Sequence, residues 1–323
     1  MAEQSALFDL GPRLPTSRDI ALMVREGGEE ALTNALLRAD AARYQEIQCK
    51  AALNRTVGMP FNWTLNAYRG CTHSCHYCFA RKYQHQLELG SDDTFSSLIL
   101  VKVNLVAILR RELDKPSWKR EQVAVGTATD PYQPIEGHYK LTRGSLQALA
   151  DARTPIGLIT KGPMVVRDID VLRELTARAS CTIYMSVPTV DEAIWRELEP
   201  GTAHPLQRLK AVQKLTEAGV RAGVLVNPLV PGFSTRRGPL GRTLEAIADH
   251  KASFAGMNTM HLEGGSRSHF MTFLRETHPA MVGRYERLYE KKYVAKNYAN
   301  LVRRRFDALR KHHRLAARAG HDD

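Results

Sequence analysis

The clearest pattern along the chain is an alternation of short apolar runs with longer amphipathic segments, which starts near residue 61. The short runs are rich in Val, Ile, Leu and Thr and have the length of strands. The longer segments repeat apolar residues every three or four positions, as amphipathic helices do. The predicted strands cover residues 63–68, 123–127, 156–160, 182–187, 222–227 and 258–262, and the predicted helices include 103–113, 142–153, 167–179, 205–218 and 240–250.

This order predicts an α/β fold with a parallel sheet, because strands that alternate with helices of about 10–15 residues form βα units. Six units are fewer than the eight of a closed barrel. We therefore expect an open, partial (β/α)6 barrel of TIM type, with a doubly wound sheet as the alternative. In both folds the functional residues gather where the strands end.

Two flanking regions lack this pattern. Residues 1–56 are a polar N-terminal extension, with a helix expected around 18–38, and residues 57–278 hold the predicted barrel. Residues 279–323 are a basic helical region. Within it, apolar side chains recur at helical spacing between Arg and Lys, which predicts a long helix with one buried stripe. The stripe consists of Tyr298, Val302, Phe306 and Leu309.

The net charge of +12 is concentrated near the C-terminus. Residues 284–318 hold twelve Lys or Arg and three Asp or Glu, a balance of +9, so the remaining residues carry only +3. Such a basic helix suits nucleic acid, although a solvated helix face is the alternative. The start of the chain has no signal-peptide pattern, and no apolar run is long enough for a membrane span. We therefore expect a cytoplasmic protein with no membrane partner.

Three of the five cysteines lie within eight positions of "RGCTHSCHYCFAR" (69–81), at Cys71, Cys75 and Cys78. Their odd number and tight spacing do not suit disulfides, and reduced cysteine clusters usually bind metal. An ordinary cubane cluster uses four cysteines, so three would leave one iron open to a substrate or cofactor. A zinc site completed by His73 or His76 is the alternative.

The C-x3-C-x2-C spacing, with Tyr77 before the last cysteine, resembles the radical SAM superfamily. This resemblance implies that Cys71, Cys75 and Cys78 hold a [4Fe–4S] cluster whose fourth iron is chelated by S-adenosylmethionine. It also implies that reduction of the cluster, by a donor such as a flavodoxin or ferredoxin, cleaves S-adenosylmethionine to a 5′-deoxyadenosyl radical.

Three longer segments are similar to the superfamily branch that contains spore photoproduct lyase and DNA-repair-photolyase-like proteins. They are "GTATDPYQPIEGHYKLTRG" (126–144), "ITKGPMVVRDIDVL" (159–172) and "LEPGTAHPLQRL" (198–209). The resemblance implies contacts to S-adenosylmethionine that suit its groups, since an ammonium needs acceptors and a carboxylate needs a cation. The implied residues are Thr129 and Asp130 at the amino group, Lys161 at the carboxylate, Ser186 at the carboxylate or ribose, and Asn227 near the adenine or ribose.

Two positions depart from spore photoproduct lyase. Thr127 stands where that enzyme has a cysteine that returns a hydrogen atom, and Phe79 stands where it has a tyrosine. We therefore do not expect repair of the spore photoproduct itself. The resemblance and the basic helix favour a lyase-like enzyme acting on a nucleobase in DNA or RNA. A radical SAM enzyme acting on a peptide or small metabolite, and a zinc-binding nucleic-acid module, are the alternatives.

Overall fold

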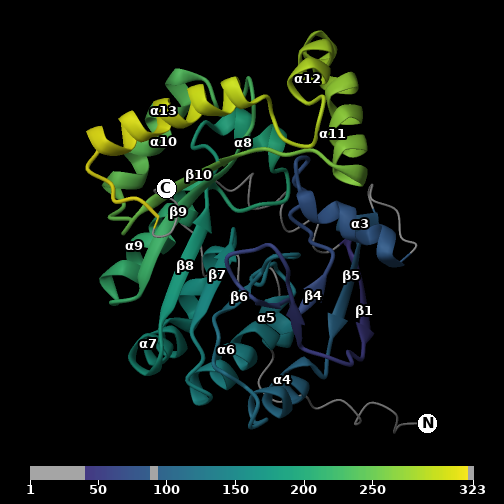
Figure 1. The fold of residues 1–323 in the computed structure, drawn as a ribbon, viewed down its shortest axis with the longest axis vertical. Helices are drawn as coiled ribbons and strands as arrows, with labels where there is room; N and C mark the ends of the chain where they lie inside the picture. The colour runs from purple at the N-terminus through teal and green to yellow at the C-terminus, as the bar shows by residue number, and fades with distance from the viewer. Residues whose placement is uncertain (1–40, 88–93, 319–323) are drawn as a thin grey trace, which may run out of the picture.

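The computed structural model describes residues 41–87 and 94–318. Its barrel strands run side by side, with helices on the outside (Figure 1). All six are parallel, and their order in the sheet is their order in the chain. The predicted open barrel of parallel strands is therefore confirmed. The strands are β3 (Trp63–Leu65), β6 (Val123–Val125), β7 (Ile156–Thr160), β8 (Cys181–Ser186), β9 (Arg221–Leu229) and β10 (Ala255–Thr259).

The central strands form because they are apolar on both faces, as strands of a covered parallel sheet must be. All three residues of β6 are buried, and so are four of the five in β7. Helices cover the outer face, close to their predicted positions, and bury their apolar stripes in one core with the sheet. These helices are α4 (Leu105–Leu113), α6 (Leu141–Asp151), α7 (Ile169–Arg178), α9 (Pro205–Glu217) and α10 (Arg237–Asp249).

A second, three-stranded sheet was not predicted from the sequence. It has the order β1 (Arg43–Ile47), β5 (Leu98–Lys102), β4 (Tyr68–Arg69). The predicted strand at 63–68 is divided, because β3 belongs to the barrel and β4 to this second sheet. β2 (Leu53–Arg55) extends the barrel sheet as an antiparallel neighbour of β3. The predicted helix around 18–38 lies outside the described residues.

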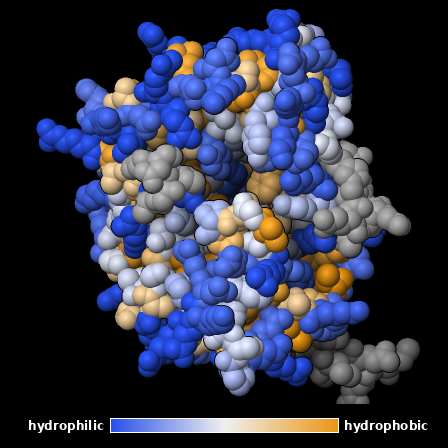
Figure 2. All heavy atoms as spheres, viewed as in Figure 1, coloured by the Kyte–Doolittle hydropathy of each residue, from blue (hydrophilic) through white to orange (hydrophobic). Residues whose placement is uncertain are grey.

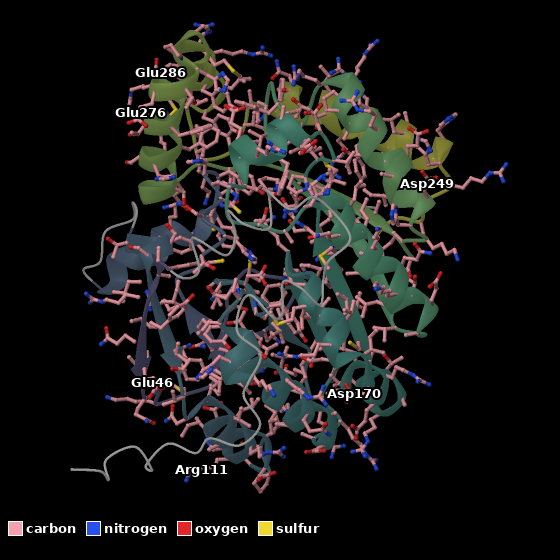
Figure 3. All side chains as sticks on the ribbon, turned by 180° about the vertical axis from the view of Figure 1, so that it is seen from behind. Glu46, Arg111, Asp170, Asp249, Glu276 and Glu286 are labelled. Atoms are coloured by element: carbon pink, nitrogen blue, oxygen red, sulfur yellow. The ribbon has the colours of Figure 1, made fainter. Side chains whose placement is uncertain are left out.

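Shorter elements surround the ends of the barrel strands. Figure 1 shows α11 (Gly264–Thr277) and α12 (Val282–Leu288) standing together beyond α3 (Thr94–Ser97). Figure 3, which views the molecule from behind, shows Glu276 and Glu286 on the outer sides of α11 and α12. Within the described ranges, no helix has both the length and the apolar character of a membrane span. The remaining short elements are η1 (Phe79–Leu87), α5 (Glu136–Tyr139), η2 (Pro163–Asp168), α8 (Glu192–Leu198) and η3 (Pro279–Met281).

The C-terminal helix α13 (Lys296–His312) packs by the stripe that its sequence predicted. Val302 and Phe306 are buried, and Tyr298 and Leu309 pack against the same core as the barrel. Beyond the helix the chain returns to β10, where the amide of Ala255 donates to the carbonyl of Ala316 over 3.0 Å. The returning segment thus lies along the last strand of the sheet. The division of the chain at residues 56 and 278 stays a prediction.

Candidate active site

The cysteine loop lies between β4 and η1, at the ends of the barrel strands. Backbone turns fold it on itself: the amide of Ser74 donates to the carbonyl of Cys71, and the amide of Cys78 donates to the carbonyl of Cys75. Ser74 adopts a φ of 50° at the bend. All three thiols are free, Cys71 and Cys75 are buried, and Cys78 is half-buried. Figure 2, in the same view as Figure 1, shows a hollow near the middle of the visible face of the molecule.

Burial and neighbouring negative charge disfavour ionisation of the cysteine thiols, as the raised pKa values show. Burial is the largest cause that raises the pKa of each, to about 12 for Cys75. At Cys71 the pKa is raised further by Asp130 and by the other two cysteines. At Cys75 it is raised further by Glu199 and Cys78. Thiolates in such a place require a positive centre between them, and the thiolate is the form that binds metal.

Both histidines of the loop have other partners. The Nδ1 atom of His73 lies 3.4 Å from Oδ2 of Asp130. The Nδ1 atom of His76 lies 3.2 Å from Nε2 of His269, and its ring stacks on Phe273 with centroids 4.2 Å apart. No group of three or more His, Cys, Asp and Glu side chains in the described part of the chain is spaced to hold a single metal ion.

The segment after α8 closes over the cysteine loop. The amide of Gly201 donates to the carbonyl of His73 over 3.1 Å, and the amide of His76 donates to the carbonyl of Leu198 over 3.1 Å. A Cβ atom on Gly201 would lie 2.3 Å from the carbonyl oxygen of Thr72, so only glycine permits this approach. The similarity noted at 198–209 thus falls on a segment that holds the loop in place.

Asp130 ties the cysteine loop to the ends of β6 and β7. Its carboxylate accepts hydrogen bonds from the Thr160 hydroxyl at 2.6 Å, the Lys161 amide at 2.6 Å and the Tyr132 amide at 2.9 Å. Burial would raise its pKa, but the opposing influence of His73 and of these donors lowers it to about 2. Asp130 is therefore an ionised carboxylate that lies next to His73 of the cysteine loop.

Thr129 and the neighbouring Gln133 hold the start of the loop. The Thr129 hydroxyl donates to the carbonyl of Gly70 over 2.6 Å and accepts from the Gln133 amide over 3.0 Å. The side-chain oxygen of Gln133 accepts from the backbone amide of Thr72 over 3.2 Å. Gln133 is fully buried. It therefore positions the loop backbone.

Lys161, directly after β7, reaches across to the end of β8. Its ammonium donates to the Ser186 hydroxyl and lies 3.0 Å from Oε1 of Glu199. The Ser186 hydroxyl in turn donates to the backbone carbonyl of Asn227 over 2.9 Å. The ammonium also lies 5.5 Å from the centre of the Tyr77 ring, inside the cysteine loop. The structure thus brings Lys161, Ser186 and Asn227 together beside the cysteines.

Glu199 and Arg208 were missed in the sequence. Glu199 is 1% exposed and accepts from the Tyr77 hydroxyl, while Oε2 lies 2.8 Å from the guanidinium of Arg208, which is fully buried. Burial would raise the pKa of Glu199, but Arg208 and Lys161 lower it to about 2. Arg208 also donates to the backbone carbonyl of Ser186 over 3.0 Å. One buried carboxylate therefore balances two cations and joins the loop to the strand ends.

The other two cysteines lie away from this site. The backbone amide of Cys49 donates to Asn104 over 2.8 Å, beside the small sheet. Cys181 is buried at the first residue of β8, at the opposite end of the strand from Ser186. Cys181 is therefore a small buried thiol of the barrel core.

The family model and one named relative indicate the same family. The model of the radical SAM superfamily matches residues 65–237. An uncharacterized protein of Mycobacterium tuberculosis is 37% identical over 281 residues, covering 86% of this chain and 83% of its own. The Radical SAM Nalpha-GlyT isomerase of Pseudomonas phage M6 is 26% identical, over 51% of this chain and 32% of its own.

Among solved structures, a spore photoproduct lyase variant with bound AdoMet and dinucleoside spore photoproduct has the same fold. Its TM-score is 0.64 at 14% identity, and the match covers 89% of this chain and 83% of that one. The predicted resemblance to the spore photoproduct lyase branch is borne out at the level of the fold.

The residues at the site fit the superfamily's cofactors. Three free thiols on one loop suit a cluster with three cysteine ligands, and the half-buried Lys161 and the buried Asp130 beside them suit the charged ends of an amino acid. The family match spans more than half of the chain. The chain thus belongs to the radical SAM superfamily, and it is an enzyme that uses a [4Fe–4S] cluster and S-adenosylmethionine, which it cleaves by a radical mechanism.

Proposed function

We propose that the site divides into a cluster-binding set and a set that holds S-adenosylmethionine. The observation that carries this proposal is the convergence of both sets at the ends of β6 to β9, with Lys161 contacting Ser186 beside the cysteine loop. The first set is Cys71, Cys75 and Cys78, and the second is Thr129, Asp130, Lys161, Ser186 and Asn227.

The hydrogen-bonding capacity of these groups supports the assignment. An ammonium has three donors, and Lys161 uses two of them on Ser186 and Glu199, so one remains for a carboxylate. The Thr129 hydroxyl donates once and accepts once, which leaves one lone pair for an amino group. When bound, the reduced cluster and S-adenosylmethionine together supply a radical that abstracts hydrogen from the substrate.

For the substrate we favour a nucleobase in DNA or RNA, in a lyase-like or DNA-repair reaction. A spore photoproduct lyase structure of the same fold holds a dinucleoside spore photoproduct. The outward face of α13 adds exposed cations at Arg303, Arg304 and Lys311. Contacts from such side chains to phosphates offset the few kcal/mol (about 2–5) that extruding a base costs.

The reaction differs from that of spore photoproduct lyase at the hydrogen-returning position. Thr127 carries a hydroxyl there, which accepts from the Asn66 amide over 3.3 Å. A hydroxyl is a poor hydrogen-atom donor, so the final donor lies elsewhere. As partners we infer an electron carrier such as a flavodoxin or ferredoxin, and we infer a cytoplasmic location.

Anaerobic reconstitution tests the cofactor assignment. We expect the purified protein to bind about four irons and four sulfides. After reduction with dithionite it should form 5′-deoxyadenosine from S-adenosylmethionine. Replacing Cys71, Cys75 or Cys78 by Ala should abolish both colour and turnover. Variants that kept both would overturn the assignment.

The salt dependence of binding tests the substrate class. If phosphates are contacted, the affinity for DNA or RNA should fall steeply as salt rises from 50 to ~200 mM. If the protein bound neither DNA nor RNA but still formed 5′-deoxyadenosine, a nucleobase substrate would be ruled out. A peptide or small metabolite would then be favoured.

A further inference from the structure

We propose that a row of four aromatic rings beside the cysteine loop binds unpaired nucleotides of single-stranded nucleic acid by stacking. This inference rests on the proposed nucleobase substrate and specifies where the flanking strand is held. The row, called here the aromatic row, consists in order of Tyr83, Phe79, His261 and Tyr293.

The four rings touch in sequence although they come from three separate segments. The centroids of Tyr83 and Phe79 are 6.3 Å apart, those of Phe79 and His261 are 5.8 Å apart, and those of His261 and Tyr293 are 5.9 Å apart. Tyr83 and Phe79 belong to η1, His261 follows β10, and Tyr293 lies between α12 and α13. Proteins that bind single strands present successive rings of this kind to successive bases.

Two rings of the row are left exposed by the residues that the structure describes. Phe79 is 39% exposed and Tyr293 is 64% exposed. They are the only Phe, Tyr or Trp side chains in the described residues that are exposed, and both belong to the same row. Exposed apolar side chains that gather at one place mark interaction sites more often than those that are scattered singly.

The row is fixed to the active site. Phe79 directly follows Cys78, and the Ser266 hydroxyl of α11 lies within hydrogen-bond distance of the carbonyls of both, at 3.0 and 3.1 Å. At the other end, the amide of Leu262 donates to the carbonyl of Lys292 over 2.8 Å, which holds the Tyr293 segment against the segment after β10. A base extruded toward the cysteine loop would therefore leave its neighbours beside these rings.

Positive charge lies at both ends of the row. The ammonium of Lys82 is 5.3 Å from the centre of the Tyr83 ring, and that of Lys292 is 5.2 Å from the centre of the Tyr293 ring. Glu263 pairs with Lys82 at 3.2 Å, while Lys292 is exposed. The basic helix α13 begins at Lys296, three residues after Tyr293. Rings flanked by cations suit a strand whose bases stack and whose phosphates are negative, and they suit an acidic peptide less well.

Fluorescence anisotropy with a labelled single-stranded 12-nucleotide DNA tests this inference on the reconstituted enzyme with S-adenosylmethionine. We expect Tyr293→Ala to weaken binding about tenfold, the usual scale for losing one stacking ring. Tyr293→Phe keeps the ring and should bind like the wild type. Met59→Ala is the control, because Met59 is 55% exposed on the β2–β3 turn, at the opposite end of the barrel strands. A duplex of the same sequence should bind more weakly than the single strand.

Three outcomes would contradict the inference in distinguishable ways. If the wild type binds the oligonucleotide and Tyr293→Ala changes the affinity less than twofold, the aromatic row is not the binding site. The nucleobase proposal would then still stand. If Arg303→Gln or Arg304→Gln alone weakened binding, the strand would lie on α13 and not on the row. If the wild type bound no oligonucleotide but still formed 5′-deoxyadenosine, the nucleobase proposal and the row would both fail.

Discussion

Replacing Glu199 by Gln should destabilise this protein far more than most single charge removals. Glu199 is 1% exposed, and its carboxylate lies 3.0 Å from the Lys161 ammonium and 2.8 Å from the Arg208 guanidinium. The substitution keeps the shape of the side chain and removes the negative charge. Two largely buried cations would then lose their counter-charge, and the hydroxyl of Tyr77 would face a weaker acceptor.

The size of the effect follows from this geometry. Removing one partner of a buried ion pair costs about 3–5 kcal/mol, because the other charge stays buried without compensation. In urea this should lower the unfolding midpoint by roughly 1 M or more. The matched control is Glu192→Gln on the same segment, since Glu192 pairs with Arg196 at 2.8 Å with both side chains more than half exposed. Exposed pairs contribute only about 0–1 kcal/mol.

Urea unfolding of the reconstituted proteins under anaerobic conditions measures both variants. The double variant Glu199→Gln, Arg208→Met should lose less stability than the two single variants added together, because it no longer buries an unpaired guanidinium. The affinity for S-adenosylmethionine should fall in Glu199→Gln, since Lys161 loses the group that holds it. A Glu199→Gln protein that unfolds at the same urea concentration as Glu192→Gln would refute the reasoning.

Three further predictions concern residues that hold the backbone and the charges of the site in place. Gly126→Ala should lower the free energy of unfolding in urea by more than about 2 kcal/mol, because φ is +83° and a Cβ would lie 2.4 Å from the Ile159 carbonyl. Gly219→Ala is the control, since its φ is +81° and nothing lies within 4 Å, and it should lower this free energy by about 1 kcal/mol. Gln133→Leu should speed the loss of iron to a chelator, because the amide of Thr72 loses its acceptor; an unchanged rate would contradict this role. The stabilisation contributed by Asp130 and Glu199 should be present above pH 4.5 and be lost as the pH falls toward 2, because the pKa of each is lowered to about 2 from ordinary values of 3.8 and 4.5. Urea midpoints measured at pH 6, 4.5 and 3 check this, and equal midpoints at pH 6 and 3 would disprove it.

Much of the barrel could be predicted because its signal is local. Most of the six parallel strands are short runs of β-branched and apolar residues, and the central strands β6 and β7 are buried on both faces, so they stand out from their surroundings. The small sheet was harder to predict. β4 has only two residues, and its partner β5 is paired by contacts between segments about 30 residues apart, which no local pattern reports.

At the site, too, the residues marked by a local pattern could be predicted, and those buried by contacts between distant segments could not. Lys161 directly follows β7, Ser186 ends β8 and Asp130 lies in the loop after β6, so the rule that parallel strands carry function at their ends found them. Glu199 ends α8 and Arg208 lies within α9, where charged side chains are ordinarily exposed. Here both are buried, and Glu199 pairs with Arg208 and with Lys161, which is distant in the sequence. The signal that could have found them was the similarity at 198–209, which contains both.

The segment that returns to β10 has a consequence for how the protein behaves in solution. Without residues 315–318, the amide of Ala255, at the start of the last strand of the open barrel, would lose its acceptor and be open to another chain. This segment therefore covers the start of that edge and limits edge-to-edge pairing there. It does so at one side of an enzyme whose barrel, being incomplete, cannot close on itself to hide that edge.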